Sequence, residues 1–348
     1  MKKLLPPFLA LSACATPQIS TPKTVNDVEM RVAIGFLASD ELEGRRAGTP
    51  GADKAAVYIA DRFRAAGLKP PKSGFQQPFI IDRKPQPLPD ASAKMPAGQR
   101  YFQEQLNKQG PFTAYNVVGR VPGRFSDGRA VVVMAHYDHL GICEPEGAHD
   151  RICNGAVDNA SGVAALIAVA ERIGRMRLDR DVWFVATSGE EWGLLGAKAF
   201  AAYPPVRLDS IIAGFNLDTI AIAPRGSPVA IVAPDDSPLN QLVRDAAAAM
   251  GRPFDADKEA QTFLRRQDGW ALTQRGVPMI MAGGSFSDMK VLEAFLGSTY
   301  HSPKDELRPD TELGGAVDDA NLHVELVRRA ASRRLLPAFR SMPHADTP

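Results

Sequence analysis

The sequence predicts an α/β protein in which a mostly parallel, mixed β-sheet carries helices on both faces within a single domain. From residue 116 onward, short β-rich runs alternate with helix-like runs, a pattern typical of parallel sheets with crossover helices. The strand-like runs "AVVVMAH" and "DVWFVATS" are almost wholly apolar, as expected for strands buried on both faces. The chain has 348 residues, 45% of them apolar, which is enough for a full core.

The expected elements follow from periodicity and from the residues that begin and end them. A helix is expected from Pro50, with Thr49 as its cap and Gly67 at its end. Between residues 70 and 112 only "FQQPFII" is expected to be a strand, and the rest to be loop. Further strands are expected at 130–136, 181–188, 210–218, 228–234 and 277–284, and further helices at 161–173, 193–203, 237–251, 268–275 and 317–334. A hairpin that joins 114–123 to 128–136 is expected at one end of the sheet.

The charge balance argues against several classes of partner. Lys and Arg together number 41, and Asp and Glu number 40. This balance gives no electrostatic reason to expect nucleic acid or an acidic membrane surface as a partner. No partner protein is implied either.

The first residues, "MKKLLPPFLALSAC", are typical of a targeting segment: two lysines, a short apolar stretch and small residues before Cys14. "LSAC" resembles the lipobox of bacterial lipoproteins, and an ordinary secretory peptide is the alternative. We therefore expect a lipoprotein signal peptide at 1–13 and a tether at 14–25. The folded domain is expected at 26–336 and a C-terminal tail at 337–348. The mature protein is then expected in the cell envelope, outside the cytoplasm, held to a membrane by a lipid on Cys14.

Cys143 and Cys153 bracket the short loop "CEPEGAHDRIC". In an oxidising compartment we expect them to form a disulfide. Two free thiols, or a zinc site with His149, are the alternatives.

Polar residues gather where the predicted strands end or where loops lead into helices. They are His136, Asp138, Asp158, Glu190, Glu191, Asp218 and His301. Because ligands of open α/β sheets collect at the carboxyl ends of the strands, we expect these side chains to lie close together. Imidazoles and carboxylates are the ligands of zinc in hydrolytic sites, and a bidentate carboxylate can hold two metals about 3.5–4 Å apart.

The neighbouring acids Glu190 and Glu191 are expected to have different roles. Adjacent residues on a turning backbone point in different directions, so one can bind a metal while the other acts as a general base. Asp138 lies two residues after His136, and its carboxylate is expected to accept the second imidazole N–H of His136.

Together these motifs resemble those of the co-catalytic di-zinc aminopeptidases, a family related to the glutamate carboxypeptidases. The resemblance rests on "HYDHLG", "NGAVDNASG", "SGEEWGLLG", "NLD" and "YHSPKDE", with "ELEGRRAGTPG" nearer the N-terminus. It implies a zinc exopeptidase-like fold, two zinc ions and a peptide substrate with a free N-terminus. By motif, His136 and Asp218 would bind one zinc, Glu191 and His301 the other, and Asp158 both. Glu190 would be the base.

The resemblance also implies that the peptide bond between Asp158 and Asn159 is cis, because it is cis in relatives with this motif. A trans Asp158 that simply caps a helix is the alternative.

Two other functions stay open. A carboxypeptidase- or dipeptidase-type relative would need cations for a substrate carboxylate, which Arg265 and Arg266 can supply. A non-catalytic, receptor-like member would be expected to lose ligands or the base, and all are present here. His139, His149 and His323 are interpreted as surface or loop residues.

Overall fold

The computed structural model describes residues 24–82, 97–125 and 127–336. The predicted signal peptide, Cys14, nearly all of the tether and the C-terminal tail lie outside the described residues. No helix in the described part of the chain is long and apolar enough to cross a membrane.

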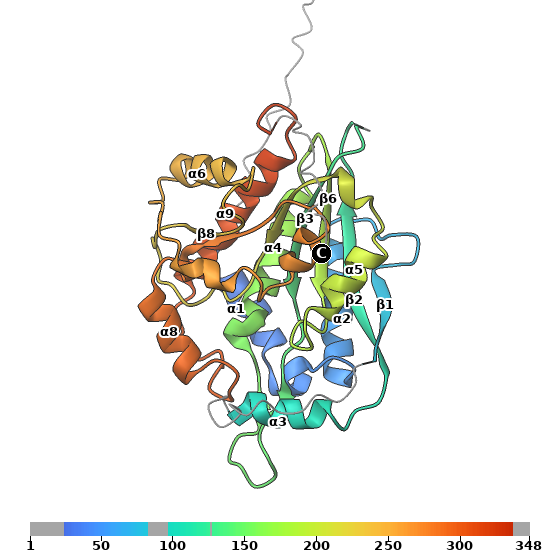
Figure 1. Cartoon of the computed structure of the whole chain (residues 1–348), viewed down its shortest axis with the longest axis vertical. Helices are drawn as coiled ribbons and strands as arrows, with labels where there is room; N and C mark the ends of the chain where they lie inside the picture. Colours follow the sequence, from blue (N-terminus) through green and yellow to red (C-terminus); the bar gives the residue numbers. More distant parts are fainter. Residues whose placement is uncertain (1–23, 83–96, 126, 337–348) are drawn as a thin grey trace, which may run out of the picture.

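A seven-stranded mixed sheet forms the centre of the molecule (Figure 1). Its strand order is β1-β2-β6-β3-β7-β9-β8. The bounds are β1 (Gln76–Ile81), β2 (Phe112–Val121), β3 (Ala130–His136), β6 (Asp181–Thr187), β7 (Ile211–Asn216), β8 (Ala230–Val232) and β9 (Met279–Gly283). A separate two-stranded ribbon pairs β4 (Gly141–Ile142) with β5 (Ile152–Cys153). The predicted fold class is therefore confirmed.

The centre of the sheet is parallel and its edges are antiparallel. Strand β3 pairs in parallel with β6 on one side and β7 on the other, and His136 is in register with Thr187. The carboxyl ends of these three strands therefore meet at one edge of the sheet.

The predicted hairpin between 114–123 and 128–136 is wrong. Strand β2 pairs with β1 and β6, and β6 lies between β2 and β3. Local sequence suggested a hairpin because the two runs are adjacent, but β3 is instead covered on both edges by parallel partners. Such partners can be reached only through crossover helices.

Helices cover both faces of the sheet. They are α1 (Asp27–Leu37), α2 (Pro50–Ala65), α3 (Ala97–Leu106), α4 (Gly162–Ile173), α5 (Leu195–Ala202), α6 (Asn240–Ala249), α7 (Gly269–Thr273), α8 (Met289–Ser298) and α9 (Gly314–Ala330). Successive residues of β3 alternate between two cores: Val131 and Val133 pack in the larger one with α4 and α9, and Val132 and Met134 pack in the smaller one with α5 and α7.

Local sequence explains where α1 and α2 begin. The side chain of Asn26 accepts a hydrogen bond from the Glu29 N–H, and the Glu29 carboxylate accepts one from the Asn26 N–H, so the two residues form a capping box at the start of α1. Thr49 caps α2 and Pro50 begins it, as expected. Helix α3 corrects the interpretation of the stretch before residue 112 as loop.

Candidate metal centre

The predicted site residues converge at the carboxyl edge of the central strands. His136 ends β3, Glu190 and Glu191 follow β6, and Asp218 follows β7. The remaining three residues come from loops: Asp138 just after β3, Asp158 from the irregular turn η3 (Ala156–Ser161) before α4, and His301 from the segment after α8. The topology thus brings together groups that are up to 165 residues apart in the sequence (301 − 136).

The first donor group consists of His136, Asp158 and Asp218. The Nε2 atom of His136 lies 3.3 Å from Oδ1 of Asp158 and 3.5 Å from Oδ1 of Asp218. Its Nδ1 atom lies 3.1 Å from the main-chain carbonyl of Asp138, so that carbonyl fixes the proton on Nδ1. The Nε2 atom then faces the two carboxylates and is the ring nitrogen that would bind a metal.

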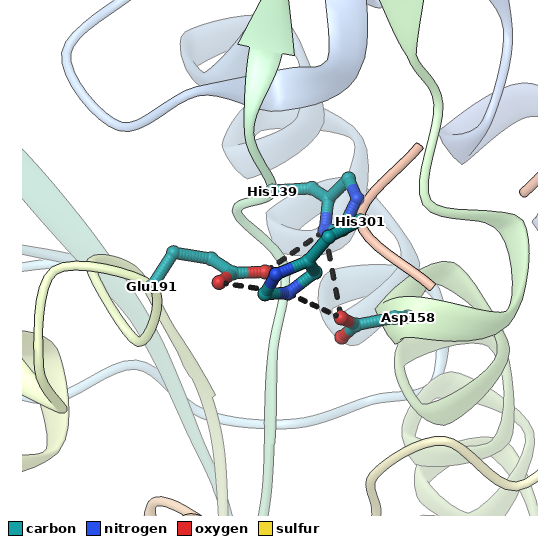
Figure 2. A group of neighbouring side chains, drawn as sticks. All are labelled: His139, Asp158, Glu191 and His301. Carbon is teal, nitrogen blue, oxygen red and sulfur yellow. Dashed lines mark ion pairs between the residues drawn. The ribbon is translucent and has the colours of Figure 1, made fainter. Parts of the chain in front are cut away.

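The second donor group includes Asp158, Glu191 and His301, which lie together with a fourth residue, His139 (Figure 2). The Nε2 atom of His301 lies 3.3 Å from Oδ2 of Asp158 and 3.2 Å from Oε2 of Glu191. Asp158 therefore offers Oδ1 to the first group and Oδ2 to the second, which is the arrangement expected of a bridging carboxylate.

His139 is not a surface or loop residue as predicted. It is completely buried, and its Nδ1 atom lies 2.9 Å from Oε1 of Glu191. His323 is also buried, within α9, and of the three histidines so interpreted only His149 is exposed. Sequence reasoning missed His139 because it took His136 and Asp138 as the functional pair of "HYDHLG" and gave the third polar residue no role.

The expected role of the Asp138 carboxylate is also corrected. Its Oδ1 atom lies 3.9 Å from Nδ1 of His136, beyond hydrogen-bond distance, and instead accepts a hydrogen bond of 3.2 Å from the Glu190 N–H. Asp138 therefore orients His136 through its main chain and Glu190 through its side chain.

The neighbouring glutamates have opposite pKa shifts. Burial raises the pKa of Glu190 well above its ordinary value, against the positive charge of His136. For Glu191, burial also acts to raise the pKa, but the nearby His301 and His139 outweigh it and lower the pKa to about 2. Glu191 is thus held as an anion suited to metal binding, and Glu190 is suited to exchange a proton.

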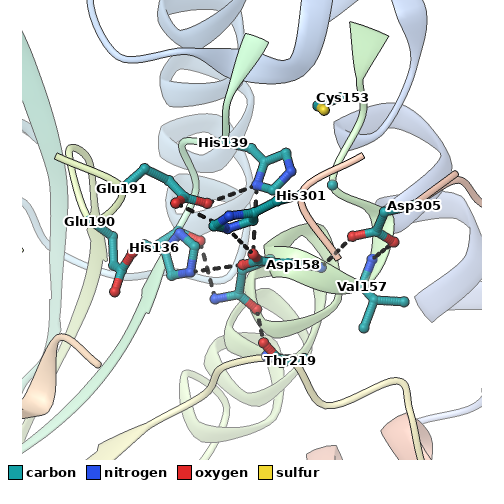
Figure 3. Close-up of polar contacts among 12 residues, drawn as sticks. His136, His139, Cys153, Val157, Asp158, Glu190, Glu191, Thr219, His301 and Asp305 are labelled. Carbon is teal, nitrogen blue, oxygen red and sulfur yellow. Dashed lines mark hydrogen bonds and ion pairs between the residues drawn. The ribbon is translucent and has the colours of Figure 1, made fainter. Parts of the chain in front are cut away.

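Two residues not predicted as functional hold Asp158 in place (Figure 3). The carboxylate of Asp305 accepts hydrogen bonds from the N–H groups of Val157 (2.8 Å) and Asp158 (3.0 Å). Asn159 donates to the carbonyls of His136 and Leu217. It therefore links the ends of β3 and β7 to the turn that carries the bridging carboxylate. The peptide bond between Asp158 and Asn159 is cis, as predicted.

Arg45, from the motif "ELEGRRAGTPG", lies fully buried behind this turn. Its guanidinium donates to the carbonyls of Tyr137 (2.8 Å), Asn154 (2.7 Å), Gly155 (3.1 Å) and Leu37. No carboxylate among the described residues lies within ion-pair distance of it. Arg45 therefore ties the loop of His136 and the loop of Asp158 to α1.

The predicted disulfide between Cys143 and Cys153 is present, with the two Cα atoms 5.7 Å apart. It closes the ribbon formed by β4 and β5, and both cysteines pack in one cluster with Trp192. Trp192 directly follows the two glutamates, so this cluster supports the glutamate turn.

A pocket opens beside the first donor group. It is lined by His136, Asp158, Glu190, Asp218, Thr219, Phe263, Arg266, Gln267, Met281, Phe286, Leu292, Leu296 and Tyr300. The lining combines apolar side chains with the carboxylates of the first donor group and Glu190. Arg266 has no carboxylate within ion-pair distance among the residues that the structure describes; its guanidinium lies over the ring of Phe263.

The donor atoms fit zinc. Histidine nitrogen and carboxylate oxygen are its usual ligands in hydrolytic sites. Within the described structure, Nδ1 of His139, Nε2 of His301 and Oε1 of Glu191 are buried and make no hydrogen bond. Buried polar atoms without partners are costly, and a metal ion would satisfy them. Two donor groups that share one carboxylate, beside a further glutamate, define the centre of a metal-dependent hydrolase.

The comparisons with known proteins agree with this class. The chain belongs to peptidase family M28, whose model matches residues 116–324. It is 26% identical over 162 residues to the alkaline phosphatase isozyme conversion protein of Escherichia coli, covering 44% of this chain and 40% of that protein. It is 28% identical over 110 residues to aminopeptidase YwaD of Bacillus subtilis, covering 31% of this chain and 22% of the relative. The chain therefore spans less than half of the length of either relative.

Solved structures share the fold. BSAP, a zinc aminopeptidase from Bacillus subtilis, superposes with a TM-score of 0.64 at 15% identity, over 90% of this chain and 97% of that one. A glutaminyl cyclase from Porphyromonas gingivalis superposes with a TM-score of 0.59 at 16% identity, over 88% and 98%.

Proposed function

We propose that this protein is a di-zinc exopeptidase that removes residues from the N-terminus of peptides. The observation that carries the proposal is the pair of donor groups that share Asp158, with Glu190 in the adjoining pocket and bound to neither group. His136, Asp158 and Asp218 would hold one zinc, and Asp158, Glu191 and His301 the other. Zinc at these positions supplies Lewis acidity to the scissile carbonyl and to the attacking water.

The chain's own residues supply the proton transfers and the positioning. Glu190 takes the proton of the attacking water and delivers it to the leaving amine. The Asp138 carboxylate holds the main chain of Glu190 in place. The free amine of the substrate is positively charged and is accommodated by the carboxylates in the pocket lining. The apolar residues of the lining, which include Met281 and Phe286, accept an apolar side chain.

Substitution of the proposed base tests the mechanism. Glu190→Gln keeps the size of the side chain but cannot take up a proton, so kcat should fall by about 10²–10⁴-fold. The zinc content, measured by elemental analysis, should stay at two ions per chain. Near-normal turnover in this variant would show that another group is the base.

A substrate panel separates the aminopeptidase from its alternatives. Matched peptides with a free or acetylated N-terminus, and with a free or amidated C-terminus, are incubated with the zinc-loaded protein and the products are identified by mass spectrometry. Release of the first residue, abolished by acetylation, is expected. Release of the last residue, abolished by amidation, would instead indicate a carboxypeptidase, in which Arg266 in the pocket would bind the substrate carboxylate.

The lipid on Cys14 and a place in the cell envelope belong to the same proposal. They are tested by mass spectrometry of the mature N-terminus.

A further inference from the structure

His139 has the properties of a metal ligand. It lies within the motif "HYDHLG", but the resemblance to the family assigns it no role. Its ring is completely buried and comes from the loop directly after β3. Figure 2 shows it beside Glu191, His301 and Asp158, facing the same point as their donor atoms. Its Nδ1 atom lies 2.9 Å from Oε1 of Glu191 and 3.7 Å from Oδ2 of Asp158.

These distances match a tetrahedral shell. With bonds of about 2.0–2.1 Å to a zinc ion, tetrahedral ligand atoms lie roughly 3.3 Å from one another. The separations around His139, 2.9 and 3.7 Å, bracket that value, and those around His301 are 3.2 and 3.3 Å. Glu191 presents Oε1 to His139 and Oε2 to His301, and one donor atom from each of the four residues lies within 4.8 Å of the others.

A hydrogen bond of ordinary geometry does not explain the position of His139, although its short contact with Glu191 helps to lower the pKa of that carboxyl. Its Nδ1 atom and Oε1 of Glu191 are close, yet neither makes a hydrogen bond within the described residues, so the N–H direction does not point at the oxygen. The other ring nitrogen, Nε2, also has no hydrogen-bond partner there. Gly155 makes room for the ring, since a Cβ at that position would lie 2.6 Å from its Cγ and Cδ2 atoms.

We propose that His139 is a fourth protein ligand of the second donor group, so that the two zinc sites are chemically different. The second group then has a complete tetrahedral shell, like structural zinc sites, whereas the first has three protein ligands and an open position, like catalytic ones. The pocket independently fits this division: its lining includes His136, Asp158 and Asp218 but not His139, Glu191 or His301. The substrate meets the first site, and the second stabilises the bridging carboxylate.

This inference rests on the proposed two-metal function and is tested by metal binding rather than by activity. The full protein is stripped of metal and titrated with Zn²⁺ against a competing chelator, and with Co²⁺ followed by visible absorption. The wild type should bind two ions in two affinity classes. His139→Ala should weaken the tighter class by at least about a hundredfold, because loss of groups that only support a ligand already costs 10–100-fold. The weaker class should persist.

Controls separate coordination from folding and from simple positioning. His149→Ala, in the exposed loop between β4 and β5, should bind both ions as the wild type does. Added imidazole should restore the Co²⁺ absorption of His139→Ala by filling the space of the missing ring. Wild-type affinities and an unchanged Co²⁺ spectrum in that variant would overturn the proposal, as would weaker binding without a spectral change. If the wild type binds a single ion, the two-metal function is refuted instead. The effect of His139→Ala on the affinity and on the Co²⁺ spectrum of that ion still tests the role of His139.

Discussion

Replacement of Arg45 by methionine should destabilise the protein severely. The substitution keeps an apolar stem of similar length but removes the donor to four buried carbonyls, those of Leu37, Tyr137, Asn154 and Gly155. The Gly155 carbonyl keeps the Ala160 N–H as a donor, and each of the other three, left without the guanidinium, costs about 1–3 kcal/mol. Relief from burying a guanidinium, whose pKa burial lowers to about 10, offsets part of the sum. We expect a net loss of at least about 3 kcal/mol, a large fraction of the typical 5–15 kcal/mol of a folded domain.

Urea unfolding of the metal-free protein, followed by tryptophan fluorescence, measures this loss without a contribution from zinc. Arg46→Met is the matched control, because the neighbouring side chain packs on Gly141 through its aliphatic part, which methionine retains. Arg45→Lys keeps the charge with three donors for four acceptors and should fall between the two variants. If the free energies of unfolding of Arg45→Met and Arg46→Met differ by less than about 1 kcal/mol, the proposed stabilisation by the Arg45 hydrogen bonds is refuted.

Three further predictions concern pH, metal and substrate. Burial lowers the pKa of His323 to about 4 from 6.5, so its stability contribution is complete above pH 6.5 and is lost as the pH falls toward 4, by about 3 kcal/mol. Between pH 7.5 and 4.5, the free energy of unfolding of His323→Asn should therefore fall by about 2–3 kcal/mol less than that of the wild type. Equal decreases would contradict the lowered pKa of His323. Chelation of the metal should lower the melting temperature, and free zinc at 100 times Kd should restore about 2.7 kcal/mol per site; an unchanged melting temperature would argue against a metal centre. Arg266→Ala should raise KM for dipeptides with a free carboxylate about tenfold, but not for their amides. Arg265→Ala, whose guanidinium lies over Trp270, is the control, and equal effects of the two variants would exclude a role for Arg266 in the pocket.

The sequence predicted the central strands and the residues that converge on Asp158, because both leave local signals. Apolar runs identify the buried strands, and polar residues that end such runs identify the edge where a ligand binds. Strand order left no such signal. Whether β2 pairs with β3 or with β6 depends on crossover connections, and the two runs look equally suited to either partner.

The functions of single residues were harder to predict than their presence. Asp138 and His139 are both buried, but the sequence could not show which atom of Asp138 faces His136, or that His139 turns inward. His323 did leave a signal: Ala316, Ala320 and Val327 lie on the same face of α9 and are all buried, so helical spacing alone places His323 in the core. The side chains of Asp305 and Asn159 form hydrogen bonds with main-chain groups, and no pattern of side chains in the sequence reveals such bonds.

Arg45 and Asp305 have a consequence for when the protein becomes able to act. The metal centre needs the hydrogen bonds of Arg45, carboxylates from the middle of the chain, and His301 and Asp305 from beyond residue 300. A partly synthesised chain cannot assemble the site from any contiguous segment. Hydrolytic capacity therefore arises only after the whole domain has formed, and zinc uptake can report when that has happened.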